Sequence, residues 1–552
     1  MSIAQSQIRA DAVTRLWDFK RLCDSRTAAG MPLIHFNMLL SDPDYREGML
    51  SKAEESSEPE LKRIAASIRA MQIHGPLRGQ ANGSAAMATP AAPNSIRLPA
   101  SGGGGGADRV DDGASFGWLG LLIGGGLLFV ASLTAAWLYW QQDGPRRIEV
   151  TGNITTDTAW KSGNTYTLQD LTFVESRARL TIEPGVTVRG APGSALVVTR
   201  DATLHARGRA DAPIVFTSAQ ALGKRRAGDW GGVVLLGNAP VNRDAHVEGI
   251  EANDSRGDFG GNDATSSCGV LDYVRVEFAG FEISKDNELN GLTLGGCGSG
   301  TIVRHVQVHR SLDDGVEMFG GTADLRHVLI TGAGDDSLDW DWGWRGRVQF
   351  LIAQQHPNSG DNAFEADNNG NQHDAEPMSE PVMYNVTLVS PRSHTRHHRA
   401  MTLREGTGGH FHNLFMHGFS GEAVDIKDAV TVGNLDNGRL SFEALAINDI
   451  GGRGIRFFED ESGDADDDGG LDEAAYFRDT VGARFGVDPQ FSRDVSSTVN
   501  PDFAPGGTSG LRDGAVAPPQ GEFWDESALY IGAIRPGAAR DWTDGWTDFP
   551  LN

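Results

Sequence analysis

Cysteine and positive charge are both scarce in this chain. Three cysteines in 552 residues exclude a small disulfide-dense scaffold. Lys and Arg total 48 against 74 Asp and Glu, which gives a formal net charge of −26. A surface of this sign repels nucleic-acid phosphates and anionic lipids, and it attracts cations. We therefore expect no nucleic-acid partner.

Helical periodicity is also missing from most of the chain. From Leu292 onward, short apolar runs alternate with Gly, Asn and Asp turns, as in LTLGGCGSGTIVRHVQVHRSLDDG and VEMFGGTADLRHVLITGAGDDS. Asp336 follows Asp314 by 22 residues, and Asp361 follows Asp336 by 25. A repeat of this length without helices predicts an all-β solenoid of stacked rungs.

One long uncharged run is present at 117–140, GWLGLLIGGGLLFVASLTAAWLYW. As a helix it would extend about 36 Å, enough to cross a hydrocarbon core of roughly 30 Å. We predict a single transmembrane helix. Arg146 and Arg147, on its C-terminal side, count against a cytoplasmic N-terminus. Gly120 and Gly124 form a GxxxG pair, so a homodimer through the helix is one alternative.

The rest of the chain divides by composition. Residues 1–75 read as a small helical region, and 76–115 as a flexible Ala, Gly, Pro and Ser linker with a reach of about 35 Å. Rungs are predicted over 148–462. The repeat is lost in 463–552, which we expect to cap the open end of the solenoid, because an unpaired sheet edge must be covered.

Two of the cysteines have related positions. Cys268 and Cys297 lie 29 residues apart, each beside a Gly turn. Adjacent rungs are about 4.8 Å apart, so a disulfide between them is sterically possible. The alternative is two unrelated small core residues.

Acidic side chains recur with the repeat. If Asp314, Asp336 and Asp361 stack on successive rungs, neighbouring carboxylates repel by roughly 3–4 kcal/mol at an effective dielectric near 20. Solvation, hydrogen bonds to turn amides, raised pKa values or a bound cation would each relieve that repulsion. The residues are therefore turn caps, ligands of a cation such as Ca²⁺, or catalytic carboxylates. Arg404 is one of several basic residues about one rung further on.

A second acidic segment resembles the start of a calcium loop. Asp464, Asp466 and Asp468 alternate and are followed by Gly469, the D-x-D-x-D-G order in which carboxylates converge on Ca²⁺. The twelfth position is Ala475 instead of Glu, and Glu473 is a candidate substitute. A solvated acidic loop is the alternative.

Three tryptophans alternate with other residues at Trp340, Trp342 and Trp344. Alternation places all three on one face of a strand. Three inward tryptophans would crowd a rung, so we predict that they face outward as a carbohydrate-stacking platform.

Several motifs in order, among them LTIEPGVTVRG, GDWGGVVLLGNAPVN, LDDGVEMFGGT and GDDSLDWDWGWRGRVQF, carry a family likeness. The segment from about 148 to 552 resembles a large group of bacterial surface and secreted right-handed parallel β-helix proteins. The resemblance implies that fold and an extracytoplasmic location, but no catalytic residues. On this ground we place the helix 117–140 in a bacterial cell membrane, with a cytoplasmic N-terminus and a periplasmic or extracellular C-terminal part. The internal membrane segment departs from the leader sequences common in that group.

Together these features predict a membrane-anchored β-helix that serves as a surface binding or structural module, with polysaccharide as a possible ligand. The alternative is a calcium-dependent polysaccharide lyase or glycoside hydrolase of the parallel β-helix type.

Overall fold

The computed structural model describes residues 43–56, 58–71 and 146–552, apart from 176, 285–286, 392–397, 452–456 and 459–466, together with a few positions between 12 and 39. The predicted linker and the predicted membrane segment at 117–140 lie outside this described part. None of the described helices has both the length and the apolar composition that crossing a membrane requires.

Two helices occupy the N-terminal region, α3 (Pro43–Glu55) and α4 (Pro59–Arg69). Pro59 suits the first turn of α4, where its missing N–H leaves no hydrogen bond unmade. Leu61, Ala65 and Ile68 recur at helical spacing and are buried with residues of α3. Arg69 Nε donates to Glu54 across the pair at 2.8 Å.

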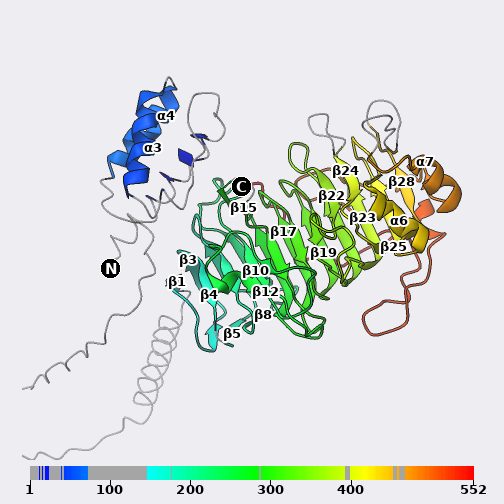
Figure 1. Ribbon diagram of the computed structural model, residues 1–552, viewed down its shortest axis with the longest axis horizontal. Coiled ribbons are helices and arrows are strands. Elements are labelled where there is room, and N and C mark those ends of the chain that lie inside the picture. The colour runs from blue at the N-terminus through cyan, green and yellow to red at the C-terminus, as the bar shows by residue number, and fades with distance from the viewer. Residues whose placement is uncertain are drawn as a thin grey trace, which may run out of the picture. The chain divides into compact units, whose positions relative to one another are not determined.

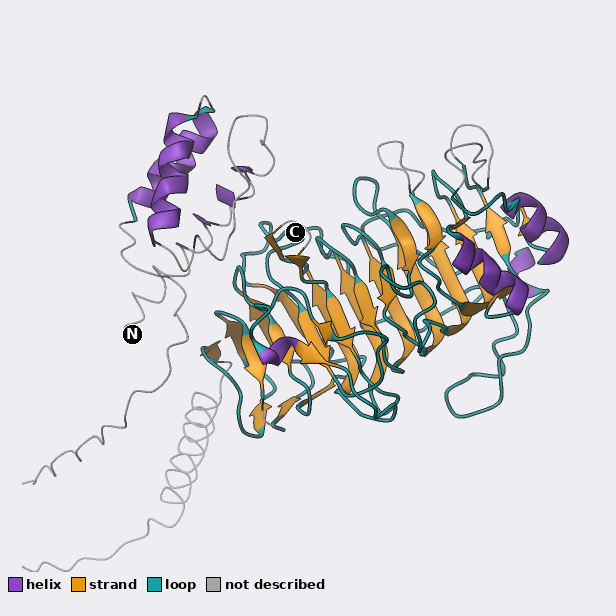
Figure 2. Cartoon of the chain, in the orientation of Figure 1, coloured by secondary structure: helices purple, strands orange, loops and turns teal. Residues whose placement is uncertain are grey.

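The β-helix consists of two long sheets whose neighbouring strands pair in parallel (Figures 1 and 2). This arrangement fits the predicted right-handed parallel β-helix. The nine-stranded sheet contains β4 (Thr172–Val174), β7 (Leu196–Val198), β10 (Val233–Leu236), β16 (Leu292–Gly295), β18 (Val316–Phe319), β20 (Leu338–Asp341), β22 (Asn362–Ala366), β24 (Arg399–Leu403) and β26 (Val424–Ile426).

The larger sheet has sixteen strands. Its shorter strands are β1 (Arg147–Val150), β2 (Thr158–Trp160), β3 (Thr165–Leu168), β5 (Arg179–Ile182), β6 (Thr187–Gly190), β8 (Thr203–Arg207), β9 (Ile214–Ser218), β27 (Leu440–Glu443), β28 (Ala446–Asn448) and β29 (Arg484–Phe485). Its longer strands are β13 (Gly269–Glu277), β17 (Ile302–His309), β19 (Asp324–Thr331), β21 (Arg347–Gln354), β23 (Val382–Val389) and β25 (Gly409–His417).

The core lies between the two sheets and runs the length of the rod. Because side chains alternate along a strand, each rung sends apolar residues inward at fixed positions. One inward column of the nine-stranded sheet, paired in register and fully buried, is Leu292, Val316, Leu338, Phe364, Met401 and Val424. Cys268 and Cys297 form a disulfide in this core.

Insertions interrupt the rungs at a few places. Two small hairpins, β11 (Ala245–His246) with β12 (Asp258–Phe259) and β14 (Glu282–Ser284) with β15 (Asn287–Glu288), extend from turns, and a short helical turn, Ser255–Gly257, precedes β12. Helix α6 (Ala429–Asn437) lies between β26 and β27, where we had expected strand. Asp428 caps this helix by accepting from the N–H groups of Val430 and Thr431.

The C-terminal residues first close the end of the coil and then cover the outer face of the sixteen-stranded sheet. This corrects the expectation that the whole of 463–552 forms an end cap. The short helix α7 (Glu473–Ala475), the π turn Tyr476–Thr480 and β29 close the end of the coil. Phe477 stacks on Phe458 at 4.8 Å between ring centres and is fully buried.

The remaining chain, which includes a short turn at Gly510–Arg512, returns along the outer face of the sixteen-stranded sheet. Phe503 and Ile534 bury Leu329 and Ile352 of that sheet. Gln307 donates to the Asp548 carbonyl at 2.7 Å, and Gly223 donates to that of Asn552 at 3.3 Å. The C-terminus therefore lies far back along the rod (Figure 1).

Candidate functional site

The strongest concentration of titratable groups lies on the outer face of the nine-stranded sheet. Glu317 of β18, Asp339 of β20 and Glu365 of β22 pair in register, so their side chains form one column. Two positions further along the strands, Asp341 and Asp367 lie on the same face. We call these five residues the acidic face.

A ladder of Asn and Asp side chains borders the acidic face at the strand starts. Asp314 N–H donates to Asn290 Oδ1 at 3.2 Å, and Asp336 N–H donates to Asp314 Oδ1 at 2.9 Å. Asn362 N–H donates in turn to Asp336 Oδ1 at 2.6 Å. Each side chain thus satisfies a backbone donor of the next rung, which is the turn-capping role considered above.

The predicted stack of Asp314, Asp336 and Asp361 is wrong at its third member. Asn362 occupies that position, whereas Asp361 N–H pairs with the Asp335 carbonyl at 3.0 Å. Because successive strand residues point to opposite faces, a shift of one residue changes which side chain enters the ladder. An amide at this position adds no further charge to the ladder.

Burial and mutual repulsion raise the pKa of most carboxyls in this region. The pKa values of Asp314, Glu317 and Asp339 lie well above their usual range, first through burial and then through the neighbouring carboxylates. Burial also raises the pKa of Asp313 to about 8 and that of Glu365 to about 7.

Arg404, the residue after β24, supplies positive charge at the edge of the acidic face. Its Nη2 donates to Glu365 at 2.9 Å, and its Nε donates to Asp367 at 2.9 Å. Burial raises the pKa of Asp367 to about 6, although the hydrogen bond from Arg404 opposes the rise. Glu365 and Asp367 therefore titrate near neutral pH while Arg404 holds both in place.

Two groups of oxygens are arranged as a divalent cation would need them. One ligand atom each from Asp314, Glu317 and Asp339 lies within 4.8 Å of the others, and so do those of Asp313, Asp314 and Asp335. Asp339 Oδ1 is inaccessible to solvent and accepts no hydrogen bond within the described chain. Hard carboxylate oxygens are the ligands that Ca²⁺ prefers, and water or a bound ligand would have to complete its coordination.

The tryptophan platform predicted from the sequence is wrong, because all three side chains are buried. Trp340 and Trp344 are fully buried in the core, where their indole N–H groups donate to Thr407 Oγ1 and the Ala323 carbonyl. Trp342 has φ of 54°, which ends the strand alternation after Asp341. Its ring packs instead against Phe259 and Phe319.

The proposed calcium loop is only partly described. Asp464 and Asp466 lie outside the described residues. Asp468 is buried, and its Oδ1 accepts from the N–H groups of Gly470 and Leu471. Glu473 lies beside it, and burial together with Asp468 raises the pKa of Glu473 to about 8.

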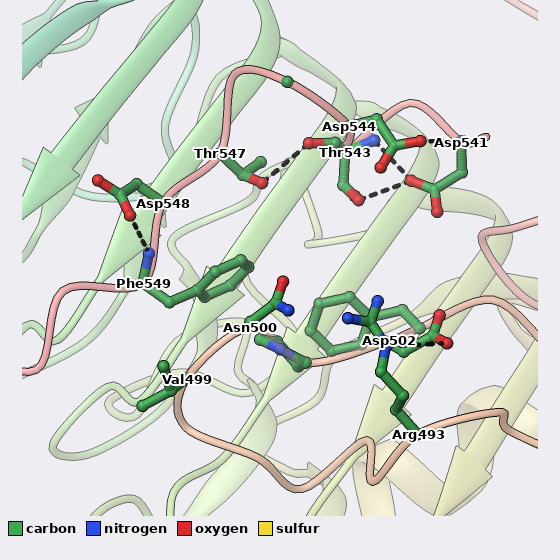
Figure 3. Close-up of a pocket in the computed structure, with 13 residues that line it drawn as sticks. Arg493, Val499, Asn500, Asp502, Asp541, Thr543, Asp544, Thr547, Asp548 and Phe549 are labelled. Atoms are coloured by element: carbon green, nitrogen blue, oxygen red, sulfur yellow. Dashed lines mark hydrogen bonds and ion pairs between the residues drawn. The ribbon is translucent and has the colours of Figure 1, made fainter.

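A separate pocket of about 270 Å³ lies between two limbs of the C-terminal tail (Figure 3). Its acidic side chains close local turns: Asp541 accepts from Thr543, and Asp548 accepts from the Phe549 N–H. Asp502 pairs with Arg493 at 3.6 Å. These carboxylates are already engaged, so the pocket ranks below the acidic face as a functional site.

The rungs stack into a parallel β-helix whose nine-stranded sheet carries the Asn and Asp ladder and the acidic face. Residues 152–457, more than half of the chain, match the pectate-lyase-like β-helix domain family, and the protein belongs to that family. No curated protein and no solved structure matches the chain. The fold is consistent with a polysaccharide-related protein.

Proposed function

We propose that the acidic face binds polysaccharide and that a divalent cation, Ca²⁺ in the first instance, joins the carboxylates to the ligand. Two observations carry this proposal: one oxygen each of Asp314, Glu317 and Asp339 lies within 4.8 Å of the others, and Asp339 Oδ1 has no hydrogen-bond donor in the described structure. A cation there would bind the orphaned oxygen and offset the repulsion. An anionic sugar would complete its coordination.

The test is calcium titration of the full chain, solubilised in detergent, with and without an acidic oligosaccharide. Asp339→Asn should weaken calcium binding at least tenfold and remove calcium-dependent sugar binding. Asp513→Asn changes an exposed carboxylate elsewhere and serves as the matched control. Equal calcium affinity in the two variants would contradict the proposal.

A second candidate function is cleavage of the bound polysaccharide, favoured by Glu365, Asp367 and Arg404. Glu365 has a pKa of about 7 and keeps a proton near neutrality, as a general acid requires. Asp367, with a pKa of about 6, is largely ionised there and can act as base or nucleophile. Arg404 orients both carboxyls.

Product analysis distinguishes binding from cleavage. Hydrolysis releases new reducing ends, whereas a lyase also releases an unsaturated uronate that absorbs ultraviolet light. Either product, lost in Glu365→Gln while calcium binding persists, would establish an enzyme. Release of neither product from acidic and neutral polysaccharides, with or without calcium, would leave the binding role alone.

We further propose that residues 117–140 anchor the chain in a bacterial cell membrane, with the β-helix on the extracytoplasmic side. The uncharged run supports the anchor. The Cys268–Cys297 disulfide supports an oxidising compartment for the β-helix. Protease added to spheroplasts should digest 148–552 and spare 1–115; the reverse pattern would overturn this topology.

A further inference from the structure

We propose that a pocket beside the acidic face binds an anionic substituent, carboxylate or sulfate, of the polysaccharide. The pocket has a volume of about 560 Å³, and its lining includes Arg200, Arg243, His246 and Phe259. That volume accommodates one sugar unit with its substituent. The inference rests on the proposed function and specifies which sugars the site takes.

Unpaired positive charge is the first argument. Most arginines near the acidic face have carboxylate partners, as Arg404 and Arg399 do. Among the described residues, Arg200 donates only to the Gly260 carbonyl, at 3.3 Å, and Arg243 lies over the Trp342 ring at 4.5 Å. Neither guanidinium has an ion pair in the described parts of the chain. In a protein with a net charge of −26, two such groups lining one pocket are suited to an external anion.

The acidic residues of the pocket do not cancel this charge. Asp258 Oδ1 lies 2.8 Å from His246 Nδ1, so its carboxylate already has a partner. Asp244 is exposed, as are Arg200 and Arg243. With Asp258 engaged, the lining sets two guanidinium groups against the one carboxylate of Asp244, and this surplus of positive charge suits a sugar that bears a negative group.

The loop that carries Arg243 is held in place before any ligand binds. Asn242 N–H donates to the Trp342 carbonyl at 3.1 Å, and Asn242 Nδ2 donates to Asn368 Oδ1 at 2.9 Å. Asn369 Nδ2 donates back to Asn242 Oδ1 at 2.9 Å. Such anchoring reduces the ordering cost of binding.

The same contacts place the pocket next to the acidic face. Trp342 and Asn368 directly follow Asp341 and Asp367 in the chain. Burial and Asp367 raise the pKa of Asp341, whereas the charge of Arg243 lowers it, so the guanidinium is within electrostatic reach of that carboxyl. A polysaccharide lying on the acidic face can therefore place a neighbouring sugar in the pocket.

The experiment compares ligands that differ only in charge. Calorimetry of the full chain in detergent and calcium would use an oligouronate, its methyl ester and a sulfated oligosaccharide. The Arg200→Ala/Arg243→Ala double variant should bind the oligouronate at least tenfold more weakly and the ester unchanged. Arg243→Lys should restore part of the affinity, and Arg207→Ala, an exposed arginine of β8, is the control.

Small anions give a readout that does not depend on polysaccharide. Sulfate or a free uronate should raise the melting temperature of the wild type more than that of the double variant. Anion stabilisation without any oligosaccharide binding would support the pocket and overturn the proposed function. Oligouronate binding that is equal in wild type and a folded double variant would overturn the pocket and leave the proposed function standing.

Discussion

The bend of the sixteen-stranded sheet depends on one residue per rung. Tyr273, His305, His327, Phe350, Asn385 and Asn413 occupy equivalent positions and have φ between 50° and 63°. Left-handed backbone is costly for most side chains. Four aromatic members offset the cost by stacking at 4.2, 4.7 and 4.8 Å between ring centres, and the two Asn tolerate this conformation intrinsically.

Asn385 also holds the C-terminal tail. Its Nδ2 donates to the Ala528 carbonyl at 3.2 Å and to the Tyr530 carbonyl at 2.7 Å, in a buried setting. We expect Asn385→Ala to lower the free energy of unfolding by about 2–3 kcal/mol, through a strained φ and the loss of three hydrogen bonds, these two and the one that Asn385 Oδ1 accepts from Gln349 at 3.2 Å. Asn385→Gly loses the same hydrogen bonds but adopts the positive φ without strain. The difference in unfolding free energy between the two variants, measured by denaturant melts, therefore gives the cost of the strain. Equal stability of wild type and Asn385→Ala would refute this account.

Glu365 should make stability depend on pH. Burial and neighbouring carboxylates raise its pKa from 4.5 to about 7 in the folded state, although Arg404 opposes the rise. Because the folded pKa is higher than the unfolded pKa, the protonated carboxyl stabilises the folded state fully at pH values below the unfolded pKa of 4.5. This stabilisation is lost as the pH rises through the folded pKa of about 7. Glu365→Gln should match wild type near pH 4.5 and exceed it by roughly 2 kcal/mol at pH 8. Thermal melts in chelator measure the difference, which should be absent for Glu526→Gln.

At the scale of elements, the repeat predicts the rungs well because apolar alternation and Gly turns are local signals. Helix α6 was missed because its β-branched residues resemble a strand, and the Asp428 cap is a weaker signal. The prediction of outward tryptophans was wrong because Trp340 follows Leu338 on the inward face of β20 and the core has room for it. The left-handed backbone at Trp342, which nothing in the sequence marks, accounts for that residue alone. Likewise, a one-residue register difference places Asn362 in the ladder in place of Asp361. The recurrence of carboxylates can be read from the sequence. The position of Arg243 beside them cannot, because its loop is distant in sequence and only the fold brings the two together.

The segment 464–473 offers a prediction about the closing element of the rod. Asp468 and Glu473 lie close together. Burial and the Asp468 carboxylate raise the pKa of Glu473 to about 8. Calcium bound only by the folded form at a hundredfold excess over Kd adds about 2.7 kcal/mol. We expect hydrogen exchange in 473–485 to slow on calcium addition, and less so in Asp466→Ala. No change at any calcium concentration would identify an ordinary solvated turn.

At the scale of the whole molecule, the tail connects the closed end of the rod to rungs much earlier in the chain. It leaves β29 at the closed end and reaches back to β13, β17 and the loop at Gly223. Trp546 is buried edge-on against Tyr273, at 5.7 Å between ring centres, and its carbonyl accepts from Arg275 at 3.1 Å. Rungs far apart in sequence are thereby covered by one segment, while the acidic face belongs to the other sheet.

Trp546→Ala should therefore loosen the covered sheet without altering the acidic face. Truncating a buried Trp typically costs about 3–5 kcal/mol. Hydrogen exchange should accelerate in β13 and β17, whose Tyr273 and His305 lose their cover, and stay slow in β20 and β22. Leu551→Ala changes an exposed apolar side chain in the same tail and should leave exchange unchanged. Calcium affinity at Asp339 should be preserved in both variants. If β20 and β22 lost protection to the same extent as β13 and β17, the rod would unfold as one unit. The tail would then not stabilise the sixteen-stranded sheet selectively.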